Sequence, residues 1–372
     1  MPKKNFLISN SIKIAVYSAG RSDFDRFLPI LNEIKNNRHI RSKISFILSQ
    51  SHFSSIFGDT YKEVSKHGFS FTFRDPKINI FSKLNYSEII SSEIKFIDKE
   101  LTKLKPDIFF VLGDRYEIIA APIAALSQKI PIGHFYGGSV TSGSLDENIR
   151  HAVSKMSHLH FVAHQKYKKR LLQMGEESWR VSVIGVPALK LMKKVSKEIS
   201  HLHFKNLYKL DIKIPTALIT FHPTTNEIFN TDAQIKNLLH ALKKTELQLI
   251  FSYPNADKGF QKIIRKIEIF SKKTPKSIII KNCGMNLYSY LLANCKVIIG
   301  NSSSGIVESS NFKIPSVNIG QRQNGKVQGI NVINVDYNSK NIFLAIKRAL
   351  SKSFKHKLIG YVSPYLLNLT KN

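Results

Sequence analysis

The stretch PDIFFVLGDRYEIIAAPIAALSQ, residues 106–128, contains one complete unit of a parallel α/β fold. Its first half is an uninterrupted apolar run, which is typical of a strand buried on both faces of a sheet. Its second half has the length and the apolar content of a helix. A strand that runs directly into a helix predicts a crossover to another parallel strand, so this stretch predicts a parallel sheet covered by helices.

The same alternation repeats on both sides of this stretch. Strands, most of them followed by a helical pattern, are expected at residues 12–20, 44–50, 130–137, 158–164 and 180–187. A second series is expected to place strands at residues 216–223, 247–257, 276–284, 296–305, 315–320 and 330–336. The sequence therefore predicts an α/β chain with an N-terminal domain over 1–187, a lysine-rich connection over 188–213, a C-terminal domain over 214–350 and a helical segment over 351–372.

The composition is that of a folded, soluble protein, because 42% of the 372 residues are hydrophobic and 22% are charged. No apolar run approaches the ~20 residues that a membrane span needs, and polar residues interrupt any signal-peptide core at the start. The two cysteines, Cys283 and Cys295, cannot form a disulfide framework. A reducing, cytoplasmic setting is therefore expected.

The net charge of +30 and the pI of about 10.0 are extreme. Such values permit binding to nucleic acid or to an anionic membrane. The lysines, however, are spread in pairs over helix surfaces, as in KYKKR (166–170) and FSKKTPK (270–276), and no aromatic-basic module accompanies them. We therefore expect a biased composition with attraction for an anionic substrate, and neither a nucleic acid nor a membrane as partner.

Polar, glycine-rich turns follow the expected strands, on the edge where open parallel sheets bind ligands. The strongest of them is GNSSSG, residues 300–305, whose Gly305 is expected to open a helix. Hydroxyls, free amides and the positive end of a helix dipole attract phosphate, so we expect an anion site here, whereas a plain helix cap needs only one serine. Glu308, one turn later, is either a ligand for ribose hydroxyls or a solvated acid. Neither a Walker loop nor a Rossmann Gly-x-Gly-x-x-Gly is present, which weighs against NAD.

Three further turns carry candidate catalytic or binding groups. Asp114 follows a buried strand, where it is either a general base or a helix cap, and Arg115 beside it would keep it ionised or bind the substrate. Arg21, in the turn Gly-Arg-Ser-Asp, is a candidate phosphate ligand, with a surface ion pair as the alternative. His222 directly follows a strand and could donate to a phosphate, act as an acid or base, or be structural.

The stretch GHFYGGSVTSGSLDENIRHA, residues 133–152, is either a surface turn or a catalytic loop. It contains His134, a candidate substrate ligand, near its start and the acids Asp146 and Glu147 near its end. Four further histidines lie in or near it: His151, His158, His160 and His164. No carboxylate or cysteine joins these four at the spacing of metal ligands, so we expect them to be structural and expect no metal site.

These motifs together resemble the UDP-N-acetylglucosamine 2-epimerase family, and within it the hydrolysing branch that makes N-acetylmannosamine-type sugars for sialic and related nonulosonic acids. The resemblance extends over almost the whole chain through GRSD, GDRYE, DENIRHAVSKMSHLHFV, TFHPTT, YPNAD, GNSSSGIVE and SVNIGQRQNGK. It implies two Rossmann-like domains in a GT-B arrangement, with the active site in the interdomain cleft and the nucleotide mainly on the second domain. It also implies a homo-oligomer, either a dimer or a tetramer.

By this resemblance, individual residues take the roles that the family assigns. The diphosphate would be held by Arg21, His222, Ser302, Ser303, Ser304 and Gly305. The ribose, the uracil and the rest of the nucleotide would be contacted by Glu308, Tyr288, Asn255 and Arg322. Asp114 matches the acid that handles the C2 proton, and Asp146 matches the second carboxylate.

The implied reaction is an anti elimination of UDP from a UDP-2-acetamido sugar to a glycal. Protonation at C2 from the opposite face and addition of water at C1 then release the inverted sugar. The elimination needs charge neutralisation at the leaving diphosphate, and neither a metal nor NAD is required.

This chain departs from the family beside the paired glycines. Family members usually carry a catalytic glutamate there, whereas this chain has Tyr136 and Ser139 at the two corresponding positions. Either Asp146 and Glu147, with His134, take over the proton transfer, or the substrate differs, or activity is reduced.

Three other functions are alternatives to the hydrolysing epimerase. They are the non-hydrolysing 2-epimerase, a glycosyltransferase of the GT-B fold and, from a different class, a basic nucleic-acid-binding protein. The motifs GRSD and SKMSHLHFV favour the hydrolysing branch. Steeply salt-dependent binding would identify a nucleic-acid-binding protein, whereas the enzyme is expected to bind UDP selectively.

Overall fold

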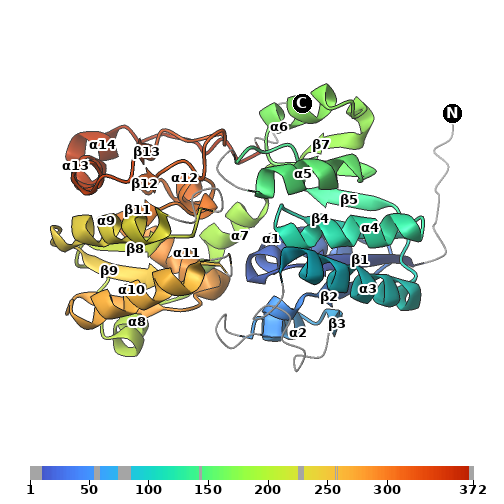
Figure 1. Ribbon diagram of the computed structural model, residues 1–372, viewed down its shortest axis with the longest axis horizontal. Coiled ribbons are helices and arrows are strands. Elements are labelled where there is room, and N and C mark those ends of the chain that lie inside the picture. Colours follow the sequence, from blue (N-terminus) through green and yellow to red (C-terminus); the bar gives the residue numbers. More distant parts are fainter. Residues whose placement is uncertain are drawn as a thin grey trace. The chain divides into compact units, whose positions relative to one another are not determined.

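The computed structural model describes residues 11–53, 59–73, 85–141, 145–224, 230–255, 257 and 259–367, but not the side chains of Arg21, Ser22 and Gln50. The chain divides into two compact units, each built around one parallel sheet (Figure 1). The first unit comprises residues 1–138 and 148–188, and the second comprises residues 139–147 and 189–372. The predicted α/β class with two Rossmann-like domains is confirmed.

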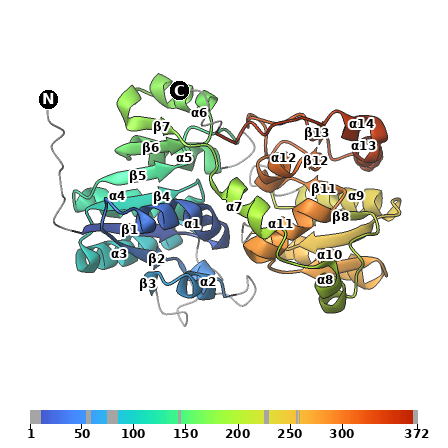
Figure 2. The ribbon, with the colours of Figure 1, turned by 180° about the vertical axis from the view of Figure 1, so that it is seen from behind.

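The first sheet has seven strands in the order β3-β2-β1-β4-β5-β6-β7, all paired in parallel. The strands are β1 (Ile12–Ser18), β2 (Ser42–Leu48), β3 (Ser70–Phe73), β4 (Ile108–Leu112), β5 (Ile132–Phe135), β6 (Leu159–Val162) and β7 (Val181–Val183). The helices are α1 (Arg21–Asn36), α2 (Tyr61–Lys66), α3 (Tyr86–Leu104), α4 (Ala120–Ser127), α5 (Asp146–Lys155) and α6 (Gln165–Gln173), with short 3₁₀ turns η1 (Gln50–Phe53), η3 (Tyr116–Ile119) and η4 (Ser178–Arg180). In Figure 1 α3 and α4 lie in front of the sheet, and in the reverse view of Figure 2 α1 does, so helices cover both faces.

The second sheet has six parallel strands in the order β10-β9-β8-β11-β12-β13. They are β8 (Thr216–Thr220), β9 (Gln248–Ser252), β10 (Ser277–Ile280), β11 (Val297–Gly300), β12 (Ser316–Ile319) and β13 (Val332–Val335). The helices from residue 188 onward are α7 (Ala188–Val195), α8 (His201–Tyr208), α9 (Thr231–Lys243), α10 (Phe260–Lys272), α11 (Gly284–Asn294), α12 (Glu308–Phe312), α13 (Ser339–Leu350) and α14 (Lys352–His356), with the 3₁₀ turn η6 (Ser303–Gly305).

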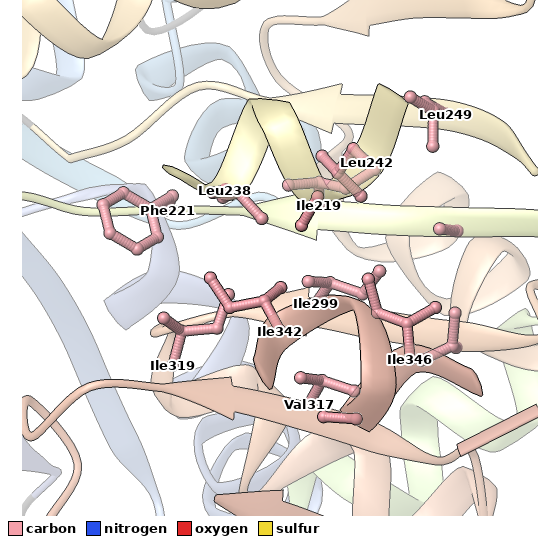
Figure 3. Close-up of a cluster of buried hydrophobic side chains, with 14 of the residues drawn as sticks. Ile219, Phe221, Leu238, Leu242, Leu249, Ile299, Val317, Ile319, Ile342 and Ile346 are labelled. Atoms are coloured by element: carbon pink, nitrogen blue, oxygen red, sulfur yellow. The ribbon is translucent and has the colours of Figure 1, made fainter. Parts of the chain in front are cut away.

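The core of the second unit explains why its strands are mainly apolar. Ile219 of β8, Ile299 of β11 and Val317 of β12 pack side by side against Leu238 of α9 and Ile346 of α13 (Figure 3). All five side chains are almost wholly buried. A sheet covered on both faces buries its central strands, here β8, β9, β11 and β12, which removes the polar alternation of a half-exposed sheet, whereas the edge strands β10 and β13 are only partly buried. This packing holds the strand ends, and the turns that follow them, in fixed positions.

Each sheet has one point at which the strand order reverses. It lies between β1 and β4 in the first sheet and between β8 and β11 in the second. In open parallel sheets, ligands bind at this point, outside the carboxyl ends of the strands. The turns that begin at Arg21 and Asp114 follow the first pair of strands, and those that contain His222 and Ser302–Ser304 follow the second. The strand order therefore places the turn of Arg21 next to that of Asp114 in the first unit, and the turn of His222 next to that of Ser302–Ser304 in the second.

Two parts of the chain differ from the expectation. The alternation predicts no element between residues 69 and 105, where the structure has β3 and the long helix α3. Glu93 and Glu100 lie on the buried face of α3 and interrupt its apolar stripe; Tyr17 donates a hydrogen bond to Glu93 at 3.0 Å. The weakly patterned connection 188–213 contains α7 and α8, and α7 buries Leu189. Among the described residues, no helix has both the length and the apolar character to cross a membrane.

Candidate functional site

The carboxyl ends of β8 and β11 are joined by Asn301, which is fully buried. Its side-chain oxygen accepts the backbone N–H of His222 at 2.7 Å, and its amide nitrogen donates to the carbonyl of His222 at 2.9 Å. Its own backbone carbonyl accepts from Gln323 at 2.9 Å and from Nη1 of Arg322 at 3.3 Å. Asn301 therefore links three chain segments beside the predicted anion-binding turn.

The serine turn adds a cluster of hydroxyl groups. Ser302 caps η6 by accepting the backbone N–H of Ser304 at 3.3 Å. The hydroxyl of Tyr288, the residue expected to stack on uracil, donates to Oγ of Ser304 at 2.6 Å. The expected helix dipole is weaker than predicted, because η6 has only three residues and α12, which begins at Glu308, has five. Any anion bound here would depend mainly on hydroxyls, local N–H groups and nearby cations.

Arg322 supplies such a cation. It is 9% exposed, and its Nη2 lies 3.9 Å from a carboxylate oxygen of Asp146 and 3.9 Å from one of Asp257. Both distances exceed that of a direct hydrogen bond, so the guanidinium has donors left for an anionic ligand. The structure thus brings Asp146, a predicted catalytic residue, to Arg322, together with Asp257, to which the sequence assigned no role.

The other predicted nucleotide ligands lie at the same edge of the second sheet. The backbone N–H of Asn255, which follows β9, donates to Nδ1 of His222 at 3.1 Å. Glu308, the first residue of α12, is 7% exposed. Gly305 packs tightly, since a Cβ atom there would lie 2.9 Å from Oγ of Ser316.

In the first unit, Asp114 is held by an arginine from another element. Gly113, at φ 88°, turns the chain after β4, and Asp114 Oδ2 accepts hydrogen bonds from Nε of Arg150 at 2.9 Å and from its Nη2. The side chain of Arg150 is 1% exposed and that of Asp114 is 30% exposed. The buried guanidinium orients a carboxylate that remains accessible, which suits a proton acceptor.

Arg115 has a different partner from the one expected. Its Nε donates to Oε1 of Glu117 at 2.7 Å, and Glu117 is fully buried. The sequence placed Arg115 beside Asp114 either as its counter-charge or as a ligand of the substrate. The pairing observed is instead Asp114 with Arg150 of α5 and Arg115 with Glu117 of η3.

His134 supports this turn from inside the protein. Its ring is fully buried, with Nε2 3.0 Å from the carbonyl of Gly113 and Nδ1 3.1 Å from Oγ of Ser154. Burial lowers the pKa of His134 to about 4, so the ring is neutral near pH 7. Because a carbonyl oxygen can only accept, the neutral ring carries its proton on Nε2. His134 contacts protein groups here, so we assign it to positioning Gly113 and Asp114 rather than to binding the substrate.

The turn that carries Arg21 is ordered by Asp23. The side chain of Arg21 lies outside the described part of the structure, but Arg21 is the first residue of α1. Asp23 Oδ2 accepts the backbone N–H groups of Ala19 at 2.9 Å and Gly20 at 3.1 Å. Burial raises the pKa of Asp23 from 3.8 to about 6, although the positive charges of Arg115 and Arg26 oppose the shift.

The raised pKa of Asp23 predicts a pH-dependent stability. Between pH 3.8 and about 6 the folded protein holds this proton more tightly than the unfolded chain, so the contribution of Asp23 to the free energy of unfolding falls as pH rises. The difference in free energy of unfolding between the unaltered protein and Asp23→Asn is expected to fall by about 3 kcal/mol across this window. Urea unfolding at several pH values measures it, and a difference that is independent of pH would contradict the assignment. The comparison with the variant is needed because burial lowers the pKa of His52 and of His134, and both shifts make the free energy of unfolding rise with pH.

The loop that carries Asp146 and Glu147 groups with the second unit. Glu147 accepts the backbone N–H of Thr141 at 2.9 Å, which closes the loop, so this predicted catalytic acid has a structural contact. Residues 142–144 of the predicted loop lie outside the described residues. Ser139 is 9% exposed. Tyr136 has a φ of 66°, and the guanidinium of Arg26 lies 6.0 Å from the centre of the Tyr136 ring.

Two of the neighbouring histidines, His160 and His164, have structural partners. His160 lies 3.0 Å from Glu176, a carboxylate that the spacing did not reveal. Glu176 also accepts from Lys155 at 2.6 Å and lies 3.4 Å from Arg180. His164 caps α6. Lys155 and Arg180 thus neutralise the carboxylate of Glu176, which supports the interpretation of His160 as a structural residue.

Comparisons with known proteins agree with this geometry. The family model for UDP-N-acetylglucosamine 2-epimerase matches residues 11–367. The chain is 38% identical over 349 residues to a GDP/UDP-N,N'-diacetylbacillosamine 2-epimerase (hydrolyzing) of Campylobacter jejuni, covering 92% of this chain and 88% of the relative. It is 32% identical to a UDP-N,N'-diacetylbacillosamine 2-epimerase (hydrolyzing) of Legionella pneumophila, covering 91% and 88%.

A solved structure shows the same fold. The UDP-GlcNAc 2-epimerase of Neisseria meningitidis, bound to UDP-GlcNAc, superimposes with a TM-score of 0.79 at 20% identity, covering 95% of this chain and 96% of the other. The sequence match over almost the whole chain, at up to 38% identity, establishes a closer relationship than fold alone. This chain belongs to the UDP-N-acetylglucosamine 2-epimerase family, as the arrangement of its motifs predicted.

Proposed function

We propose that this protein is a hydrolysing 2-epimerase of UDP-2-acetamido sugars. The observation that carries the proposal is the constellation at the strand-order reversal of the second sheet, where His222, Arg322 and the Ser302–Ser304 turn converge around buried Asn301. Hydroxyls, an imidazole and a guanidinium fit a diphosphate, which must be neutralised as it leaves. Family membership and hydrolysing relatives support the same activity.

In the proposed reaction Asp114 removes the C2 proton as UDP leaves from C1. Asp114 has the partial exposure that a proton acceptor needs, and Arg150 orients it. Asp146, at the start of α5 and near Arg322, is the acid proposed to return a proton to C2 in place of the family glutamate absent at Tyr136 and Ser139. Glu147 is the weaker candidate, because it already holds the loop backbone.

The sugar is proposed to be UDP-N-acetylglucosamine or a derivative with a second acetamido group. The relatives from Campylobacter jejuni and Legionella pneumophila are named for diacetylbacillosamine, which supports the derivative. The product would then serve nonulosonic acid synthesis. We also propose a cytoplasmic enzyme that assembles as a dimer or tetramer, which light scattering after size-exclusion chromatography measures directly.

Incubation with each UDP-sugar in deuterated water, followed by NMR, tests the reaction. Free UDP together with a C2-inverted sugar carrying deuterium at C2 is the expected result. An inverted sugar still attached to UDP would identify the non-hydrolysing reaction instead. If neither sugar reacts although UDP binds, the proposed epimerase activity is wrong and a nucleotide-binding role remains.

Ser303→Ala is expected to weaken UDP binding by about three- to tenfold, because one hydroxyl donor to the diphosphate is lost. Titration calorimetry with UDP measures the change. Ser351→Ala, which removes an exposed helix-capping serine before α14, serves as the control and is expected to keep the affinity. Equal affinities for both variants would argue against a diphosphate at this turn.

A further inference from the structure

Asp257 meets Arg322 across the carboxyl edge of the second sheet. Asp257 follows β9 and Arg322 follows β12, and the strand order β9-β8-β11-β12 puts two strands between them. Neighbouring strands lie roughly 5 Å apart, so the ends of β9 and β12 are separated by about 15 Å. Oδ2 of Asp257 nevertheless lies 3.9 Å from Nη2 of Arg322. The two side chains therefore meet beyond the carboxyl ends of β8 and β11.

This meeting point adjoins the proposed diphosphate site. Nη1 of Arg322 donates to the carbonyl of Asn301, which lies between β11 and the serine turn, at 3.3 Å. The turn after β9 is tied to the turn after β8, since the backbone N–H of Asn255 donates to Nδ1 of His222 at 3.1 Å. An anion bound between the serine turn and the turn after β8 would therefore lie beside the contact of Asp257 with Arg322.

A second carboxylate approaches the same nitrogen of Arg322. Oδ2 of Asp146 also lies 3.9 Å from Nη2. The side chains of Arg322, Asp257 and Asp146 are 11%, 16% and 25% exposed, so water screens their charges less than at an open surface. One guanidinium carries a single positive charge, whereas two carboxylates carry two negative charges. These three side chains together place one net negative charge beside a site that is proposed to bind a diphosphate.

We propose that Asp257 competes with the diphosphate of a UDP-sugar for Arg322 and thereby limits the affinity of the site for UDP. The identity of this anion rests on the proposed function. When a diphosphate enters, its oxygens and the carboxylate of Asp257 accept from the same guanidinium, so each contact of Arg322 with phosphate weakens its contact with Asp257. A limited affinity favours the release of UDP after the sugar has left, and product release limits the turnover of many enzymes.

The opposite role would be that Asp257 holds Arg322 in place for the ligand. Loss of the carboxylate would then weaken binding, because a preorganised donor binds an anion better than a mobile one. The geometry favours competition. The hydrogen bond to the carbonyl of Asn301 already fixes the guanidinium, whereas the 3.9 Å distances to the two carboxylates are too long for hydrogen bonds.

Asp257→Asn separates the two roles, because asparagine keeps the shape of the side chain and removes its charge. The UDP dissociation constant, measured by titration calorimetry at fixed ionic strength, is expected to fall by about five- to thirtyfold, the effect of one partly shielded charge at this range. Damage to the fold cannot produce such a gain in affinity. An unchanged or a larger dissociation constant would overturn the proposal.

Asp211→Asn is the matched control. Asp211 is also an aspartate of the second unit that pairs with a cation, Lys205 at 3.1 Å, but it precedes β8 and so lies at the opposite edge of the sheet. This variant is expected to keep the UDP affinity of the unaltered protein. An equal gain in both variants would reduce the effect to the net charge of the protein and would overturn the role of Asp257.

A double-mutant cycle tests whether Asp257 acts through Arg322. In a protein that carries Arg322→Gln, the further change Asp257→Asn is expected to alter the UDP dissociation constant by no more than about twofold. NMR titration extends the measurement to weak binding. If the full gain persists without the guanidinium, Asp257 repels the diphosphate directly and the proposed competition for Arg322 is wrong.

The same measurements distinguish this inference from the proposed function. If UDP binds to the unaltered protein but Asp257→Asn brings no gain, the inference fails and the proposed function stands. If the unaltered protein binds no UDP, the proposed function fails, and the ligand named here fails with it.

Discussion

Asp114→Asn is expected to lower turnover by about 10²- to 10⁴-fold, the contribution of a general base. The amide keeps the size of the carboxylate but cannot take the C2 proton. UDP affinity is expected to stay nearly unchanged, because His222, Arg322 and the Ser302–Ser304 turn, which carry the proposed diphosphate site, lie on the second unit, whereas Asp114 lies on the first. Release of UDP from the UDP-sugar, followed with a coupled assay, gives the turnover, and calorimetry gives the affinity.

The pairing of Asp114 with Arg150 requires a test of folding beside this assay. Arg150 is fully buried, and leaving a buried charge without its partner typically costs about 3–5 kcal/mol of stability. Circular dichroism and thermal melting of Asp114→Asn are expected to show a folded protein, since an amide oxygen still accepts from the guanidinium. Loss of the fold would make Asp114 a structural residue and remove it from the mechanism. Asp232→Asn, which alters an exposed aspartate paired with two lysines, is expected to keep full turnover.

Gly300→Ala is expected to lower the free energy of unfolding by about 3 kcal/mol or more, the range of severe backbone clashes. Gly300 has φ 141°, a region essentially confined to glycine, and a Cβ atom there would lie 1.9 Å from the carbonyl oxygen of Thr220. That oxygen belongs to the neighbouring strand β8, so it cannot move without breaking the sheet beside His222. Urea unfolding measures the loss, and UDP affinity should fall with it.

Gly175 provides the control for this substitution. It also has a positive φ, at 88°, but nothing lies within 4 Å of the position of its Cβ atom. Gly175→Ala therefore adds backbone strain alone and is expected to cost about 1 kcal/mol. Similar losses in both variants would show that the close approach at Gly300 is relieved by a local shift.

Every strand except β3 could be predicted, because the sheets of both units are covered by helices on both faces and their strands are mainly apolar. Residues 106–128, for example, are predicted as a strand and a helix, and the structure has β4, η3 and α4 there. No helix was predicted over α3 because two glutamates, Glu93 and Glu100, lie on its buried face. Only the packed structure shows that Tyr17 donates a hydrogen bond to Glu93. A local pattern cannot identify a polar residue whose partner lies far away along the chain.

The same limit separates the candidate residues from their partners. The sequence by itself determined the α/β class, the family and the turns that carry Asp114, His222 and the three serines, because each depends on local pattern or on a run of motifs. Only the tertiary structure paired Asp114 with Arg150 and joined Asn301 to His222, since these pairs are 36 and 79 residues apart. Strand order decides which turns meet, and strand order depends on packing over the whole sheet rather than on any single stretch.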